Sequence, residues 1–290
     1  MATSKGQKIN PKKFDRGQWK IILIVLPLVI FMGMPIIFII NHAFKPMEEL
    51  FAFPPTFFVR SPTLENFTKL MKFSDSSGIP LSRYIFNSLI VTVITVGLAL
   101  LLTTLSAFAL SKIKFKGRNM LAQINQIAIM FVGTAVLIPR YIVICQLGLI
   151  DNLFAHILPL VAMPVALFLV KQFVEQIPDS LLEAAYMDGA TDFDVYIKVI
   201  LPMIKPAIAT ASILVFQQVW TNMETSSYFF SDDSMKTLTF YMNTLVNANN
   251  SVAGQGMGAA ASLIMFIPNL VLFIILQNKV MNTMANSGIK

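Results

Sequence analysis

The sequence predicts an all-α, polytopic membrane protein with six transmembrane helices. Hydrophobic residues make up 56% of the 290 residues and charged residues only 13%, whereas about a quarter of the residues in a soluble domain are charged. Several apolar runs reach the length of about 20 residues that a helix needs to cross roughly 30 Å of hydrocarbon. The mean hydropathy of +0.69 also favours a lipid environment.

Six apolar runs are long enough to span a membrane. We place the helices at 20–43, 84–110, 121–144, 153–175, 203–223 and 258–280. An even number of spans puts both termini on the same side of the membrane. We therefore expect a single transmembrane domain at 20–281, with an N-terminal tail at 1–19, external loops at 44–83 and 224–257, a cytoplasmic elbow at 176–202 and a C-terminal tail at 282–290.

The basic residues are distributed unevenly across these spans. Of the 22 lysines and arginines, 15 fall on the side of the termini and 7 on the opposite side, so the positive-inside rule predicts cytoplasmic termini. The clearest signal is the short turn 112–118, which carries four cations. Because the basic residues behind the net charge of +7 lie at the chain start and in short loops, we expect contact with membrane lipid and none with nucleic acid.

The elbow between the fourth and fifth spans contains two short helical patterns. Ser180 and Glu183 have the spacing of a capping box, and Gly189 can adopt the left-handed conformation that ends a helix. Thr191 offers a second N-cap before Asp194, and Pro202 follows that second segment. Helices this short are marginal in isolation. We therefore expect the elbow to dock on another surface, such as a partner protein.

The elbow resembles a known family motif. Glu183-Ala184-Ala185, then Asp188-Gly189-Ala190 and Ile200-Leu201-Pro202, are similar to the EAA loop of ABC importer permeases. Downstream, the segments 206–216 and 220–222 and Lys236-Thr237-Leu238 resemble the carbohydrate-uptake branch, typified by the second permease of the maltose importer. The likeness covers nearly the whole chain. It implies the transmembrane fold of a type I ABC importer in the bacterial inner membrane.

The resemblance also implies roles, partners and an energy source. The EAA helix would be a coupling helix in a cleft of an ATPase subunit, formed by Glu183, Ala184, Ala185, Asp188, Gly189 and Ala190; one alternative is that Glu183 only completes the capping box. The expected partners are a second permease, two ATPase subunits, an extracellular solute-binding protein and a carbohydrate. No phosphate-binding loop occurs in the sequence, so ATP and Mg would be bound by the ATPases, with no cofactor in this chain. Tyr186 departs from the family pattern, in which a basic or small residue is common.

Polar residues within an apolar helix are candidates for a solute pathway. The strongest group lies near the outer end of the fifth span: Gln217, Gln218, Trp220, Thr221 and Asn222. Amide hydrogen bonds and ring stacking would suit a sugar, but the same groups would equally suit hydrogen bonds between helices.

Other polar residues are expected to be structural. Asn125 and Gln126 are weaker pathway candidates, which we expect to pack against a neighbouring helix. Arg140 is expected to snorkel, His42 and His156 to lie near helix ends without special function, and Cys145 to be buried.

Two other classes of function remain as alternatives. A secondary transporter for a small polar solute would normally show ionisable residues in mid-membrane or helices broken in matched halves. A membrane-bound enzyme would need a catalytic cluster of residues. Neither signature is evident in the sequence, so we expect a transport subunit and no enzyme.

Overall fold

Three long helices form the frame of the molecule in the computed structural model, which describes residues 16–76, 78–248 and 252–287. They are α1 (Arg16–Phe44), α4 (Leu81–Lys112) and α15 (Val252–Ser287). Each contains a segment of 24 to 32 residues that is apolar enough to cross a membrane. All elements in the described ranges are helical, which confirms the predicted all-α class.

The other three predicted spans are bent. α5 (Arg118–Met130) meets a short helix η1 (Gly133–Val136) and α6 (Leu137–Gln146) at 110°, and α7 (Phe154–Val161) meets α8 (Pro164–Glu175) at 44°. The third pair joins a segment at 192–203 to α12 (Lys205–Trp220) and α13 (Glu224–Tyr228) at 79°. Counting each pair as one span gives six.

The prediction of continuous helices at 121–144 and 153–175 is therefore wrong. The third bend lies at the start of the span predicted at 203–223, and α12 is continuous from Lys205 to Trp220. In the second pair, Ala162 and Met163 are extended immediately before Pro164, because a proline disfavours helical geometry in the residue that precedes it. In the first pair, Phe131 and Val132 are extended. The 13 residues of α5 rise only about 20 Å, less than the thickness of the hydrocarbon.

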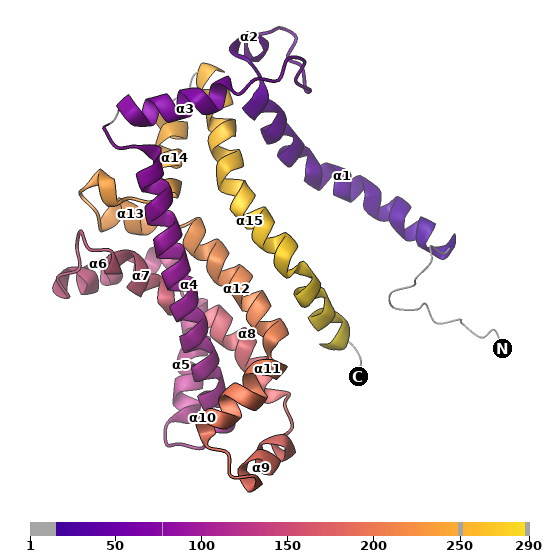
Figure 1. Ribbon diagram of the computed structural model, residues 1–290, viewed down its shortest axis with the longest axis vertical. Helices are drawn as coiled ribbons and strands as arrows, with labels where there is room; N and C mark the ends of the chain where they lie inside the picture. Colours follow the sequence, from indigo (N-terminus) through magenta and orange to yellow (C-terminus); the bar gives the residue numbers. More distant parts are fainter. Residues whose placement is uncertain (1–15, 77, 249–251, 288–290) are drawn as a thin grey trace.

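The core lies around α4, which packs on α7, α8 and α12, while α12 packs in turn on α15 (Figure 1). Small side chains occupy the contacts, among them Ala99, Ala107, Ala166, Ala207 and Ala211. Such residues let helix backbones approach closely in a membrane, where dispersion contacts hold helices together. α1 packs mainly on α15 (Figure 1). Its apolar side chains are largely exposed.

The predicted external loop at 44–83 contains α2 (Met47–Leu50) and α3 (Glu65–Ser76). The buried Lys45 ammonium donates a hydrogen bond to the carbonyl oxygen of Thr56, and the Asn66 amide donates to the carbonyl oxygens of Ala43 and Lys45 at 3.0 and 2.8 Å. The predicted loop at 224–257 likewise contains α13, η3 (Asp233–Met235) and α14 (Leu238–Ala248). Both segments are thus built from helices packed on the ends of the spans.

The two ends of the molecule differ in the elements that they carry. α2 and α3 lie at one end, and α9 (Asp179–Met187) projects at the other, beyond the lower ends of α4 and α5 (Figure 1). α1 begins and α15 ends toward the α9 end (Figure 1). The elbow is therefore far from the helices that cover the opposite end.

Candidate functional site

The start of α9 differs from the sequence prediction. The N-cap is Pro178, with extended backbone angles of −61° and 136° and no side-chain cap, so Ser180 lies inside the helix. The predicted capping box of Ser180 and Glu183 is therefore wrong. Proline fixes its own φ near −65°, and it starts the helix before Ser180 is reached.

The end of α9 is a Schellman motif. Gly189 has a φ of +82°, its amide donates to the carbonyl oxygen of Tyr186 at 3.0 Å, and the amide of Ala190 donates to that of Ala185 at 3.0 Å. These are the two bonds that define the motif, which requires a left-handed residue. The predicted role of Gly189 in ending this helix is confirmed.

The second helix of the elbow begins with a complete capping box. The amide of Asp194 donates to the Thr191 hydroxyl and the amide of Thr191 donates to the Asp194 carboxylate, both at 3.2 Å. Hydrogen bonds from Lys198 and Thr191 lower the pKa of Asp194 to about 2. The predicted N-cap is confirmed, and α10 (Asp192–Val195) starts directly after Thr191.

The segment after α10 is continuous through Pro202, contrary to the predicted stop there. A π-helical turn, η2 (Tyr196–Ile200), runs into α11 (Leu201–Met203), and the bend comes at Ile204. A π-turn widens the backbone locally. It accommodates a proline, which has no amide hydrogen to complete the usual helical ladder.

Contacts with α4 hold α9 in place. The Lys112 ammonium at the end of α4 donates to the Ile177 carbonyl oxygen and forms an ion pair with the Asp179 carboxylate at 2.7 Å. This hydrogen bond lowers the pKa of Asp179. Leu182 is buried in the main core, and Ala185 packs against it. α9 is therefore anchored at its first turn and along one face.

The opposite face of α9 is exposed. Glu183 and Ala184 lie on it, and among the described residues Glu183 forms no hydrogen bond or ion pair. Met187 is 88% exposed. Asp188 and Gly189 are also exposed, whereas Ala190 packs against the core. This exposed face, which we call the elbow face, can accept a partner without any rearrangement of the contacts that anchor the helix.

Tyr186 joins the two helices of the elbow. Its hydroxyl donates a hydrogen bond to the Asp192 carboxylate at 2.8 Å. Partial desolvation and this bond raise the pKa of Tyr186. The residue that departs from the family pattern thus also fixes the relative position of α9 and α10, a role that sequence spacing did not indicate.

The five candidate pathway residues occupy different environments. Gln217 and Gln218 are exposed on α12. Trp220 is 5% exposed, stacks on Phe216, and donates from Nε1 to the Met265 carbonyl oxygen of α15 at 3.0 Å. The Thr221 hydroxyl donates to the Gln217 carbonyl oxygen at 2.7 Å, and the Asn222 side chain accepts from the Thr225 amide at 3.1 Å. Only the two glutamines therefore present uncommitted polar side chains.

Several residues with expected structural roles occupy unexpected positions. Arg140 does not snorkel but pairs with Glu224 of α13. Cys145 is exposed, which contradicts its predicted burial, because it lies on the outer face of the short α6 and not inside a continuous span. Asn125 donates to the Pro164 carbonyl oxygen at 3.2 Å, whereas its neighbour Gln126 is exposed. The first of these two residues thus braces the bend in the α7–α8 pair.

A hydrogen-bond network around His156 was missed from the sequence. His156 is fully buried, and its ring nitrogens lie 2.7 Å from the Thr225 hydroxyl and 3.1 Å from the Met235 carbonyl oxygen. It also stacks on Phe230 at 3.9 Å. His42, by contrast, makes a hydrogen bond to the Phe38 carbonyl oxygen of its own helix. The signal available in the sequence was the polarity of His156 and Thr225. That these two side chains pair with each other depends on the fold.

Comparison with known proteins places the chain in a family. The model for "Binding-protein-dependent transport system inner membrane component" matches residues 120–278, which include the elbow and the α12 glutamines. The chain belongs to this family of ABC importer permease subunits, which are transport components of a multi-pass membrane type and not enzymes.

Relatives and a solved structure extend the likeness beyond this segment. The chain is 28% identical over 258 residues to the inner membrane ABC transporter permease protein YcjP of Escherichia coli, covering 88% of this chain and 90% of that protein. It is 29% identical to the sulfoquinovosyl glycerol permease SmoH of Agrobacterium fabrum, covering 88% of each. A bacterial alginate ABC importer shares the fold, with a TM-score of 0.77 and 22% identity over 92% of this chain and 99% of that one.

Proposed function

We propose that this chain forms half of the translocation pathway of an ABC importer for a carbohydrate, and specifically for an oligosaccharide. The names of several relatives support this substrate class: they transport arabinooligosaccharides, diacetylchitobiose and sulfoquinovosyl glycerol. The similar solved importer carries alginate, and a second structure of such an importer includes a periplasmic protein loaded with an alginate pentasaccharide.

The elbow face carries the proposal. It joins an unpaired carboxylate at Glu183 with the small Ala184, on a helix fixed to α4 through Lys112 and Asp179. A cleft in a partner can enclose a helix that has small side chains, and a basic residue there can form a charge-assisted hydrogen bond with Glu183. Because α9 is anchored by an ion pair to α4 and by a leucine buried in the main core, displacement of α9 is transmitted to the spans.

The proposed cycle uses two copies of this device, one in each permease. ATP and Mg bind in the two ATPase subunits, whose closure moves both coupling helices together. The permease pair then changes from an inward-facing to an outward-facing cavity, and a loaded extracellular binding protein delivers the sugar to it. Hydrolysis resets the pair. In this scheme α9 and both termini face the cytoplasm of a bacterial inner membrane.

Within this chain, Gln217 and Gln218 are the proposed sugar contacts. Both are exposed on α12, whereas Trp220 and Asn222 are engaged in contacts with α15 and α13. Amide side chains donate and accept hydrogen bonds, as a neutral polyol requires. Of the five candidate pathway residues, we therefore propose only these two glutamines as sugar contacts.

Glu183→Gln tests the coupling role directly. The chain is co-expressed with its second permease, purified in detergent, and titrated with separately purified ATPase to obtain the Kd. We expect about tenfold weaker binding, since a hydrogen bond to a charged group contributes about 1.5–3 kcal/mol. Glu48→Gln is the matched control, because Glu48 is an exposed carboxylate at the opposite end of the molecule.

Equal ATPase affinity in wild type and Glu183→Gln would contradict the coupling role of this residue. Uptake of radiolabelled oligosaccharides into vesicles then tests the substrate class. We expect uptake to need ATP and the binding protein. Uptake that follows an ion gradient without ATP would instead favour secondary transport.

A further inference from the structure

The turn between α4 and α5 carries a concentration of positive charge that the coupling role does not use. Lys112 is paired with Asp179, but in the described part of the chain Lys114, Lys116 and Arg118 form no ion pair. Lys112 and Lys114 both lower the pKa of Asp179. This carboxylate thus interacts with two of the four cations in the turn.

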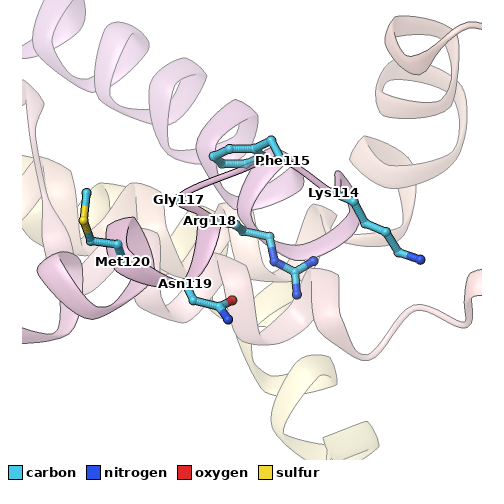
Figure 2. A pocket seen from close by; sticks show the side chains of 6 residues that line it. All are labelled: Lys114, Phe115, Gly117, Arg118, Asn119 and Met120. Atoms are coloured by element: carbon cyan, nitrogen blue, oxygen red, sulfur yellow. The ribbon is translucent and has the colours of Figure 1, made fainter.

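A pocket lies in this turn. Its volume is about 360 Å³, and its lining consists of Lys114, Phe115, Gly117, Arg118, Asn119 and Met120. Figure 2 shows the polar ends of Lys114, Arg118 and Asn119 extending in the same general direction, while the Phe115 ring lies on the other side of the turn. Cationic groups, an amide donor and apolar side chains thus surround one depression.

The backbone shapes this pocket. Gly117 has a φ of +91° and forms the N-cap of α5, which has no side-chain cap. The chain therefore reverses tightly, bringing Lys114 close to Arg118. The partial positive charge at the uncapped N-terminus of α5 adds to the charge of the cations, and both favour the binding of an anion.

The position of the pocket indicates the source of the anion. The turn joins α4 to α5, both parts of candidate membrane spans, so it lies where hydrocarbon gives way to water. Phe115 and Met120 are 41% and 60% exposed, which suits acyl chains and not a soluble ion. α9 projects further than this turn (Figure 1), so the elbow face is the more accessible one for a protein partner.

We propose that this pocket binds the phosphate headgroup of an anionic membrane lipid. Arg118 and Lys114 contact the phosphate, since a guanidinium matches its geometry in a bidentate manner. Asn119 donates a further hydrogen bond, and the acyl chains lie along Phe115 and Met120. The bound headgroup also offsets the repulsion among the cations beside the Lys112 anchor of α9.

Lipid retention by the purified full chain, with its partner subunits, tests this proposal. The complex is reconstituted in nanodiscs of phosphatidylcholine containing phosphatidylglycerol, extracted into detergent, and examined by native mass spectrometry for bound lipid. We expect wild type to retain phosphatidylglycerol selectively. Each Lys or Arg near an anionic bilayer contributes a factor of about 5 in binding, so Lys114→Gln/Arg118→Gln should reduce retention by about 25-fold.

Lys205→Gln is the matched control, because Lys205 is an exposed cation at the start of α12, at the same end of the molecule and outside the pocket. Retention should stay within about twofold of wild type, because Lys205 does not line the pocket and charges that are exposed to solvent are screened from one another by salt. Equal retention by the double variant, or equal retention of phosphatidylcholine, would overturn the proposal. Displacement of the lipid by millimolar inorganic phosphate would assign the pocket to a soluble anion instead, and retention only after the ATPase has been removed from the complex would assign it to that protein.

Discussion

At the scale of single residues, the end of α9 depends on a left-handed backbone conformation that glycine adopts more readily than other residues. Gly189 has a φ of +82°, and a Cβ added to it would enter open space. Any substitution there is therefore opposed by backbone conformation alone, with no steric clash to confuse the result. The sequence signalled this residue because glycine tolerates left-handed geometry at no steric cost.

Gly189→Ala should weaken ATPase binding several-fold. Alanine in the left-handed region costs about 1–2 kcal/mol, so the Schellman bonds open and α9 loses its fixed end. Gly97→Ala is the control, since a Cβ added at Gly97 would also enter open space, but this residue has ordinary helical geometry in α4. Titration of the purified permease pair with ATPase measures the affinity of each variant for the ATPase. Equal affinity in the two variants would show that the end of α9 is not needed for coupling.

At the scale of elements, the pairing of α12 with α15 decided which polar residues remain available. The Trp220 indole is buried against α15 and bonded to Met265, whereas Gln218, two residues earlier, is exposed. Residues two apart on a helix face different directions. A segment that looked uniform in sequence is thus divided between a packing face and a free face.

Trp220→Phe should affect stability, whereas Gln218→Ala should affect sugar uptake. Trp220→Phe removes an interhelical hydrogen bond, worth about 0.6 kcal/mol in membranes, so we expect a slightly lower Tm and normal uptake per folded complex. Gln218→Ala should leave the Tm unchanged and reduce sugar uptake. Thermal unfolding in detergent and vesicle uptake measure the two properties. Lost uptake with an unchanged Tm in Trp220→Phe would assign the tryptophan to the pathway.

At the scale of the whole molecule, the elbow and the helices that cover the opposite end are separated along the long axis (Figure 1). α9 marks one end, whereas α2 and α3 mark the other. The predicted alternation of cytoplasmic and external segments would place these two ends on opposite sides of the membrane. To test the proposed orientation, it is therefore enough to determine which of the two ends faces the cytoplasm.

Labelling of single cysteines decides this orientation. Cys145 is first replaced by serine, because it is exposed and would react. In that background, Ser231→Cys should react with a membrane-impermeant maleimide in intact spheroplasts, and Ser180→Cys only after permeabilisation; both serines are exposed. The reverse pattern would invert the topology and remove the coupling proposal.

The sequence alone determined the helical membrane class, the approximate spans, the Schellman end at Gly189 and the capping box at Thr191. These features depend on composition and on contacts within a few residues. The three bends, the burial of Trp220, the Arg140–Glu224 pair and the network of His156 were decided only by the tertiary structure. They depend on which helices are neighbours, and residues 69 or 84 positions apart carry no local signal that they will meet.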